Sequence, residues 1–312
     1  MPYVHIPAMV HEVLQYLDCK PGKVIVDCTL GAAGHAKAIL EQIIPNGFLI
    51  GIDQDKEAIE SARDTLRRYS SNIELFHGNF VRISEALSAK GIDAVDGILL
   101  DLGVSLHQLK NSGRGFSFNK DEPLDMRMNT DSATTAADIV NNMSQEDLVN
   151  IFRVYGQERW ARRIARAIVS VRSHKKIRTS AELAELVLKA VPKKHRYGQR
   201  IHPATRVFMS LRIAVNKELE RLEQVLKVAV NLLKPKGRLC VLSYHSLEDR
   251  IVKQQIRLLE KGRSRDPYLQ ECICDGRASV VNLTRKPIRP SKKEIKQNPM
   301  ARSARLRAIE KH

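Results

Sequence analysis

Acidic residues follow short apolar runs at three places in this sequence, and one of them suggests a bound nucleoside. Asp27, Asp53 and Asp101 end the runs VIVD, FLIGID and GILLD. Asp53 lies about 20 residues past the first glycine of a Gly/Ala-rich turn, a separation typical of an acidic side chain that accepts both hydroxyls of a ribose. Because the side chains from Gly31 to Gly34 are absent or a single methyl, their backbone can approach a flat ligand closely. The two features together imply a nucleoside-containing cofactor.

The glycine spacing narrows the kind of cofactor. The turn reads Gly31-x-x-Gly34, and Ala33 stands where a dinucleotide-binding G-x-G-x-x-G loop would gain from a glycine. The missing glycine counts against a pyrophosphate, although this motif is weak in either direction. S-adenosylmethionine carries no phosphate and fits such a turn, with Asp53 on the ribose and Phe80 against the adenine. Each residue also has a purely structural explanation, because Asp53 could cap a helix and Phe80 could be part of the core.

Asp101 could orient an exocyclic amine for methylation. The amino nitrogen of cytosine or adenine has its lone pair delocalised into the ring, so it attacks poorly unless acceptors hold its N–H groups. A carboxylate at the end of a strand can supply such an acceptor. Methylation at a cytosine carbon needs a cysteine nucleophile near the end of the fourth or fifth strand, whereas Cys28 precedes the first loop and Cys240 is mid-strand. Nitrogen is therefore the favoured acceptor atom.

Alternating strands and helices would position these residues. Apolar runs separated by amphipathic helices predict five strands, at residues 24–27, 48–52, 73–77, 97–100 and 237–243, and residues 279–283 are one more strand candidate. The alternation predicts an α/β fold with a parallel sheet and right-handed crossovers. Ligands bind at the carboxyl ends of such strands, which is where Gly31, Asp53, Phe80 and Asp101 all fall.

The chain between the fourth and fifth strands is typical of an inserted domain. Residues 102–130 have no sustained period and predict a long structured loop, and residues 132–202 are wholly helical in pattern. We therefore predict a discontinuous cofactor-binding domain over residues 1–110 and 203–312. The loop and helices at residues 111–202 would form a substrate-binding domain.

Local signals predict where helices begin and which faces they bury. Ser144 and Thr179 are expected helix caps, and Ser246 is expected to cap the helix after the fifth strand. A long helical segment begins at Pro203, with a break expected at Asn216. One helix of the insertion is expected to bury a stripe formed by Trp160, Ile164, Ile168 and Val171.

The balance of charge indicates a polyanionic partner. The 312 residues carry a net charge of +17, and the pI is near 9.8. Residues 157–200 hold thirteen Lys or Arg against three Glu, and residues 283–312, a predicted basic tail, hold ten against two. Four arginines lie mostly off the expected buried stripe: Arg159, Arg162, Arg163 and Arg166. Such an excess suits phosphates better than water alone, so nucleic acid is the expected partner.

Hydropathy and cysteine usage predict a cytoplasmic protein. No apolar run approaches the ~18 residues needed to cross a bilayer, and the stretch MPYVHIPAMVHEVLQYLD lacks the basic start of a targeting signal. Five cysteines are an odd number and argue for a reducing compartment. Cys272 and Cys274 are half of a structural zinc site without a second pair of ligands at the usual spacing, so we predict no metal.

Motifs along nearly the whole chain resemble one family. In order they are DCTLGAAGH, GIDQD, HGNF, DGILLDLGVS, RGFSF, PLDMRM, HPATR, SYHSLEDR and NPMARSARLR. Together they resemble the bacterial 16S ribosomal RNA (cytosine-N4) methyltransferases, the RsmH or MraW family. The resemblance implies a class I, Rossmann-like S-adenosylmethionine-dependent methyltransferase with an inserted all-helical domain. The implied reaction is transfer of a methyl group to the exocyclic N4 of a cytidine in the decoding region of 16S rRNA.

The resemblance also implies site residues, with Asp101 as the catalytic one. S-adenosylmethionine would lie against Ala33, Gly34, His35, Asp53, Phe80, Asp101 and Gln108. Two positions depart from the family pattern, because Ala33 replaces the usual glycine and SLHQL, which contains Gln108, stands where SSPQL is common.

The residues that would bind the target base are less specified. Asp101 has no aromatic neighbour of the D-P-P-Y/F kind, so the stacking residue is left open among Phe116, Phe118 and Tyr244. Arg206 in HPATR and His245 in SYHSLEDR are further substrate-binding candidates.

Partners and rival functions follow from the same residues. The implied partner is 16S rRNA or the small ribosomal subunit, with no membrane, and a homodimer stays open. One rival is a ribosome-assembly factor with a degenerate nucleoside site, motivated by Ala33 and the positive charge. The other is a nucleotide-dependent oxidoreductase, which rests on the strand, turn and helix around Gly31 alone.

Overall fold

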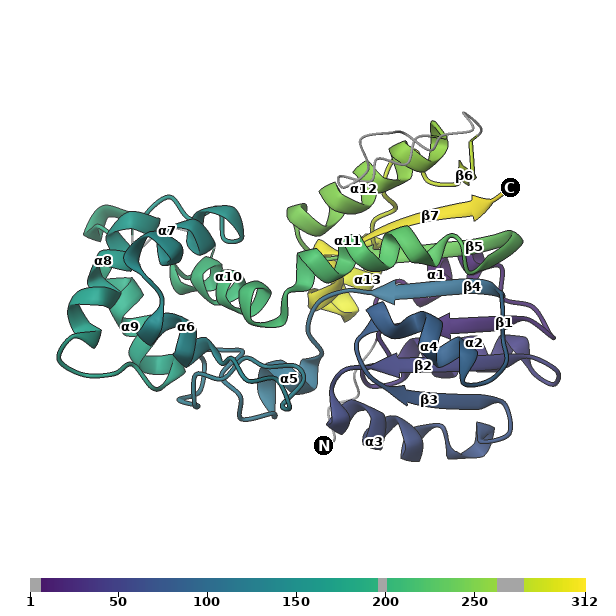
Figure 1. Cartoon of the computed structure of the whole chain (residues 1–312), viewed down its shortest axis with the longest axis horizontal. Helices are drawn as coiled ribbons and strands as arrows, with labels where there is room; N and C mark the ends of the chain where they lie inside the picture. Colours follow the sequence, from purple (N-terminus) through teal and green to yellow (C-terminus); the bar gives the residue numbers. More distant parts are fainter. Residues whose placement is uncertain (1–6, 196–200, 263–277) are drawn as a thin grey trace. The chain divides into compact units, whose positions relative to one another are not determined.

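The chain folds into two compact units. The computed structural model describes residues 7–195, 201–262 and 278–312. Residues 1–103 and 219–312 form one unit, called here the sheet unit, and residues 104–218 form the other, called the helical unit. The seven strands of the described residues all lie in the sheet unit, and helices α5 to α10 lie in the helical unit (Figure 1). The predicted α/β class with a helical insertion is confirmed.

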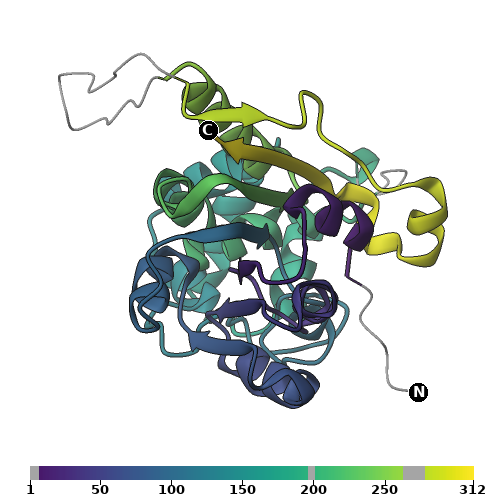
Figure 2. The ribbon, with the colours of Figure 1, turned by 90° about the vertical axis from the view of Figure 1, so that its right-hand side faces the viewer.

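A seven-stranded sheet forms the centre of the sheet unit, in the order β3-β2-β1-β4-β5-β7-β6 (Figure 2). Strands β1 to β5 run parallel, and β7 is antiparallel to both of its neighbours. The strands are β1 Val24–Asp27, β2 Phe48–Asp53, β3 Ile73–His77, β4 Val95–Asp101, β5 Leu233–Ser243, β6 Val280–Asn282 and β7 Arg305–Lys311. The chain order reverses beside β1, so the crevice typical of ligand binding lies at the carboxyl ends of β1 and β4.

Side chains along the strands alternate between two apolar clusters, one on each face of the sheet. Ile25 and Leu49 belong to one cluster, and their neighbours Val26 and Ile50 belong to the other. Three helices contribute to the first cluster: α1 Val10–Leu17, α2 Gly34–Ile43 and α3 Lys56–Thr65. Three contribute to the second: α4 Ile83–Ser88, α11 Glu218–Ala229 and α12 Ser246–Glu260. The sheet is thus the middle of three layers, with core on both faces.

The last residues of the predicted basic tail are part of the sheet. Residues 305–311 form β7 inside the sheet, after the helix α13 (Lys292–Gln297) and a 3-10 helix, η4, at Pro299–Ser303. Arg305 and Arg307 pair with Asp249 at 3.0 and 2.7 Å, and Arg307 is only 6% exposed. These arginines neutralise an acid of α12, because the alternation of the strand places apolar neighbours on the core side and the acid within reach.

Some predicted ends of strands and helices differ from the observed ends by a few residues. The predicted strand at 279–283 is confirmed as β6, and β5 begins at Leu233, earlier than the predicted residue 237. The cap of α12 is His245 in a capping box with Glu248, so the prediction of Ser246 was wrong by one residue. The caps at Ser144 and Thr179 are confirmed.

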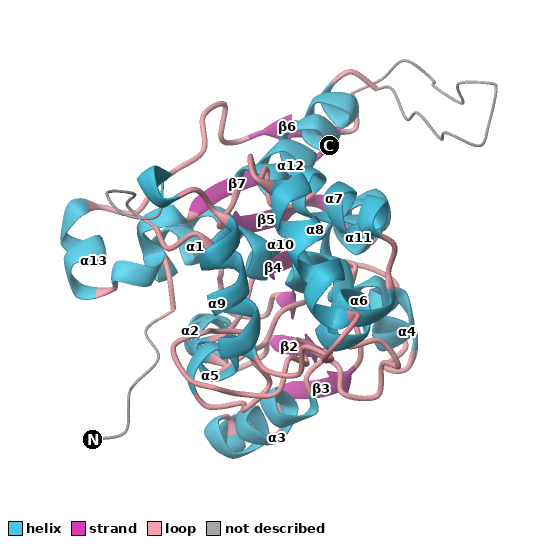
Figure 3. Cartoon of the chain, turned by 90° about the vertical axis from the view of Figure 1, so that its left-hand side faces the viewer, coloured by secondary structure: helices cyan, strands magenta, loops and turns pink. Residues whose placement is uncertain are grey.

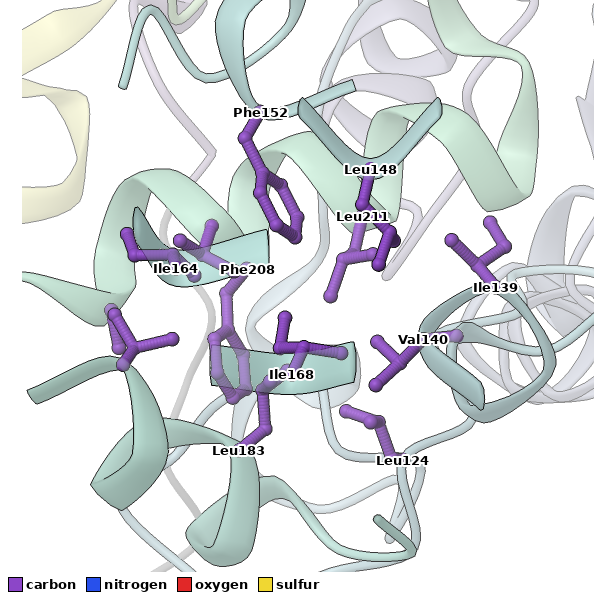
Figure 4. Close-up of a cluster of buried hydrophobic side chains, with 14 of the residues drawn as sticks. Leu124, Ile139, Val140, Leu148, Phe152, Ile164, Ile168, Leu183, Phe208 and Leu211 are labelled. Atoms are coloured by element: carbon purple, nitrogen blue, oxygen red, sulfur yellow. The ribbon is translucent and has the colours of Figure 1, made fainter. Parts of the chain in front are cut away.

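Helices of the helical unit, labelled in Figure 3, share an apolar core of their own. Figure 4 shows their buried side chains meeting in this core. Its helices are α5 Leu106–Lys110, α6 Ala136–Asn142, α7 Gln145–Val154, α8 Ala161–Arg172, α9 Ser180–Ala190 and α10 Ala204–Asn216, with the 3-10 helix η3 at Lys193–His195. Ile164 and Ile168 are fully buried as predicted, whereas Val171 is 42% exposed and not part of the stripe. None of the helices in the described part of the chain is long and apolar enough to cross a membrane.

The boundaries of the helical unit differ from the predicted 111–202. The predicted cofactor-binding domain, with its second segment at residues 203–312, includes helix α10. Residues Val207, Phe208 and Leu211 of this helix are instead buried in the core of the helical unit. The helical unit therefore ends after the break at Asn216, a break that is confirmed by the end of α10. Amphipathic spacing marks a buried face, but it does not say which core buries that face.

The PLDMRM motif folds the loop that precedes α6. Arg127 forms a bidentate pair with Asp125, at 2.8 and 2.7 Å, and also donates to two backbone carbonyl groups. The amide of Asn216 donates to the carbonyl of Met126 at 2.8 Å, and its oxygen accepts from the N–H of Met128 at 2.8 Å. The long loop is thus fixed by polar side chains, which explains why it has no hydrophobic period.

Candidate active site

The turn between β1 and α2 brings the backbone to the carboxyl edge of the sheet. Gly31 has a φ of +49° and Ala33 a φ of +61°, in the left-handed region where glycine is least strained. A Cβ atom on Gly34 would lie 2.8 Å from Cγ of Pro7, so this position leaves no room for a side chain. Ala33 is fully buried in the apolar cluster of α2, whereas Gly31 and Gly34 are partly exposed. The methyl of Ala33 packs into the core, whereas the backbone of the two glycines is partly exposed at this edge.

Asp53 is held at the end of β2 by backbone N–H groups. Its Oδ2 accepts from the N–H of Gly31 and its Oδ1 from the N–H of Asp55, both at 2.8 Å. The cap of α3 is Asp55, whose carboxylate accepts from the N–H of Glu57, so the explanation of Asp53 as a helix cap is wrong. Burial raises the pKa of Asp53 to about 6. The backbone N–H of Gln54 also donates to this carboxylate.

Phe80 begins the 3-10 helix η2, Phe80–Arg82, which follows β3. Asn79 caps this helix by accepting from the N–H of Val81 at 3.1 Å, and its amide donates to Gln54 at 2.8 Å. The N–H of Gly78 donates to the carbonyl of Asp53 at 2.8 Å, which ties the ends of β2 and β3 together. Phe80 is partly buried against an apolar cluster and keeps exposed surface at this edge.

Asp101 lies at the centre of a hydrogen-bonded group at the end of β4. Its Oδ1 accepts from the hydroxyl of Tyr244 at 2.8 Å, and its Oδ2 lies 3.4 Å from Nδ1 of His35. Its backbone N–H donates to the hydroxyl of Thr29 at 2.6 Å. The far ring nitrogen of His35, Nε2, lies 2.8 Å from the carbonyl oxygen of Ala8. The Asp101 side chain is 19% exposed, so it is accessible while its position is fixed from two sides.

His35 contributes to this site through Asp101. Its residue exposure is 5% and both ring nitrogens have partners, so its side chain is not free to contact a cofactor. Burial alone would lower the pKa of His35, but the hydrogen bond to Asp101 and its negative charge raise that pKa above the ordinary value. What His35 offers directly to a ligand is its backbone N–H in the first turn of α2.

Tyr244 and His245 follow β5, and each of their side chains has a hydrogen-bond partner within the sheet unit. The hydroxyl of Tyr244 donates to Asp101, and burial together with that carboxylate raises the pKa of Tyr244 well above its ordinary value. His245 caps α12 by accepting from the N–H of Glu248 at 3.4 Å. Tyr244 thus acts on the carboxylate of Asp101, and His245 has a capping role.

The other predicted residues belong to the helical unit, and their surroundings are described within that unit. Gln108 is the third residue of α5, and its side chain closes a capping box with Ser105. Phe116 is 6% exposed within the helical core, and Phe118 packs partly buried against the same core. Arg206 is exposed on α10. Phe116 is therefore too buried to stack on a base, whereas Arg206 is accessible to a phosphate.

Asp27 is a site residue to which the sequence pattern assigns no role. It is fully buried at the end of β1, its Oδ1 accepts from the N–H of Thr29 at 3.1 Å, and its Oδ2 has no hydrogen-bond partner in the described part of the chain. Burial raises the pKa of Asp27 to about 6, and the positive charge of His35 opposes that rise. A carboxyl group with a perturbed pKa beside other titratable groups marks a candidate active site. Its sequence signal is a polar residue that ends an otherwise apolar strand.

We expect Asp27 to make folding stability fall as the pH rises from about 4 to about 6. Its carboxyl group titrates near 3.8 when the chain is unfolded and near 6 in the fold, so in this window the unfolded chain loses a proton that the fold keeps. Above about pH 6 the penalty is complete, at about 3 kcal/mol. Hydrogen exchange of amides in the sheet unit, corrected for intrinsic exchange rates, measures this loss of stability in the wild type and in Asp27→Asn at pH 4 and pH 7, because the Asn side chain does not titrate. Equal changes in both proteins would contradict the assignment.

Comparison with known proteins identifies the family. Residues 2–312 match the family model described as the MraW methylase family. Relatives named Ribosomal RNA small subunit methyltransferase H include one from Desulfosudis oleivorans, 51% identical over 311 residues and 100% of both chains. The protein of that name from Desulforapulum autotrophicum is 51% identical over 307 residues and 98% of both chains, and that from Geobacter sulfurreducens is 48% identical over 311 residues and 100% of both. The chain therefore belongs to the MraW methylase family.

Proposed function

We propose that this methylase transfers a methyl group from S-adenosyl-L-methionine to the exocyclic N4 of a cytidine in the decoding region of 16S rRNA. The observation that carries the proposal is the accessible carboxylate of Asp101, fixed by Tyr244 and His35 at the carboxyl edge of the sheet. The relatives are named as methyltransferases of small-subunit ribosomal RNA, which supports the class of substrate.

The edge of the sheet unit fits S-adenosyl-L-methionine. Asp53 offers two carboxylate oxygens to the ribose, the exposed surface of Phe80 suits the adenine, and the partly exposed glycines of the turn let the amino-acid part approach. When bound, this cofactor supplies a methyl group made electrophilic by a positively charged sulfur. The buried acid Asp27 and the carboxylate of Asp101 favour a positive charge at this edge.

Asp101 suits an amine acceptor because it can accept hydrogen bonds from the N–H groups of the base. With one oxygen bonded to Tyr244 and the other beside His35, the carboxylate has a fixed orientation and still one free acceptor site on each oxygen. Accepting from the exocyclic amine aims its nitrogen and stabilises the positive charge that develops on it during methylation.

The cysteines do not suit methylation at carbon. Cys28 and Cys240 are buried, and burial raises the pKa of each thiol well above its ordinary value, which leaves them protonated and poorly nucleophilic. Cys19 is partly buried, and burial raises its pKa to about 12. Cys272 and Cys274, the pair that resembles half of a structural zinc site, lie outside the described residues.

The helical unit is the proposed RNA-binding part. Arg162, Arg163 and Arg166 are exposed on α8, and no ion pair among the described residues uses them. Arg159 is also exposed, with its guanidinium 5.0 Å from the centre of the Trp160 ring. Exposed guanidinium groups without acidic partners suit RNA phosphates. The proposed partner is 16S rRNA or the small ribosomal subunit. This partner agrees with the prediction of a cytoplasmic protein. The homodimer stays a prediction.

Transfer of labelled methyl groups to isolated small subunits tests the function. Subunits come from a strain that lacks this enzyme, and the RNA is digested to nucleosides after reaction with labelled S-adenosyl-L-methionine. The expected product is labelled N4-methylcytidine, and subunits from the parent strain, already modified, should take up no label. Label at another atom would contradict the choice of N4. No label, with the cofactor still bound, would contradict the substrate.

A further inference from the structure

The hydrogen bonds of His35 fix where its ring protons lie. A carbonyl oxygen can only accept, so the 2.8 Å contact between Nε2 and the carbonyl of Ala8 places a proton on Nε2. The other nitrogen, Nδ1, faces Oδ2 of Asp101 at 3.4 Å. A neutral ring would turn a lone pair toward a carboxylate oxygen, which is repulsive. The pair must therefore hold a proton between Nδ1 of His35 and Oδ2 of Asp101.

The surrounding groups favour this proton on His35. The hydroxyl of Tyr244 donates to the other oxygen of Asp101, and a donor to a carboxyl oxygen stabilises the ionised form. Asp27 also acts on His35, and its negative charge favours a positive ring. Asp101, Asp27 and the carbonyl of Ala8 are thus the groups that favour a protonated His35.

We propose that His35 and Tyr244 are positioning residues for Asp101. His35 is an imidazolium that donates to Oδ2, Tyr244 donates to Oδ1, and between them they keep Asp101 an ionised carboxylate in one orientation. The inference rests on the proposed function, in which both oxygens of an ionised Asp101 can accept hydrogen bonds from the exocyclic amine of the base. It gives His35 a role through its side chain beyond the cofactor contact that the family resemblance implies.

The two hydrogen-bond donors to Asp101 come from segments that are far apart in the sequence, so the arrangement depends on the tertiary fold. His35 lies in the first turn of α2, and Tyr244 follows β5. The charged groups that act on Tyr244 are Asp101, Glu248 and Glu294, all acidic, so the phenol is kept neutral and remains a donor. Loss of either donor would leave one carboxylate oxygen without its partner and free the side chain to rotate.

The first test is the protonation state of His35 in the free protein, read from the ¹⁵N shifts of its ring by NMR. Backbone assignment identifies the ring, so no variant is needed. We expect both nitrogens to be protonated at pH 7, and the Asp101→Asn protein to show a neutral ring at the same pH. A neutral His35 in the wild type would overturn the inference. This readout uses neither cofactor nor RNA, so its failure would leave the proposed function standing.

The second test is the kinetics of Tyr244→Phe, which removes one hydroxyl. We expect kcat to fall about tenfold or more, with KM for cofactor and RNA little changed. Tyr69→Phe is the matched control, since it removes the hydroxyl of a buried tyrosine of the same unit, which donates to Glu41 at 3.1 Å. A Tyr244→Phe enzyme with wild-type kcat would overturn the role of Tyr244.

Discussion

Replacing Asp101 with alanine lowers the rate of methyl transfer about a thousand-fold or more, while S-adenosyl-L-methionine and RNA still bind. The large loss is expected because Asp101 is the accessible acid at the end of β4, and it lies 2.8 Å from Tyr244 and 3.4 Å from His35. Alanine removes the only group proposed to accept from the amine. Single-turnover transfer measures the rate, and calorimetric titration of the cofactor measures binding.

Asp96→Asn is the control for that variant. Asp96 lies on the same strand as Asp101 but near its other end, where it accepts from the N–H of Val24 and from Lys234 at 2.9 Å each. Asparagine keeps an acceptor there, and we expect normal transfer by this variant. If Asp101→Ala lost RNA affinity and kept its single-turnover rate, Asp101 would not be the catalytic residue.

Phe152→Ala is expected to destabilise the helical unit by about 3 to 5 kcal/mol. Phe152 is fully buried in the apolar core that Figure 4 shows, so its removal costs both the transfer free energy of the ring and the cavity left behind. Val154→Ala on the same helix is the control, because Val154 is 50% exposed and a surface change of this kind usually stays within about 0.5 kcal/mol.

Hydrogen exchange is the suitable measurement for this pair, since the chain has two units and a single unfolding transition cannot be assumed. We expect amides within residues 104–218 to exchange faster in Phe152→Ala and to keep wild-type rates in Val154→Ala. Unchanged protection in Phe152→Ala would mean that the core repacks around the missing ring.

The sheet and one edge of the site could be predicted from the sequence because they follow from local pattern. Apolar runs that stop at Asp27, Asp53 and Asp101 mark strand ends, and parallel strands bring those ends together. The bonds around Asp101 could not be predicted in this way. Tyr244 lies 143 residues further along the chain, and nothing in the sequence near Asp101 identifies it as the donor.

Residue type alone gave the wrong exposure for two predicted residues. Arg307 contributes to the excess that suggested a tail, yet it is buried in β7 against Asp249, an acid 58 residues away. Phe116 was chosen as an aromatic near the expected site, but the core of the helical unit buries it. In both cases tertiary packing decides exposure, and residue type alone does not.

The division of the chain has a consequence for folding. Strands β4 and β5 are paired neighbours in the sheet, but residues 104–218 lie between the two segments that carry them. If that stretch were unfolded, pairing the two strands would close a flexible loop of roughly 115 residues, with a conformational-entropy cost of about 4 kcal/mol. A folded helical unit replaces that loop with a compact body. A mutation confined to its core can therefore weaken the strand pair that carries Asp101 without touching any residue of the sheet.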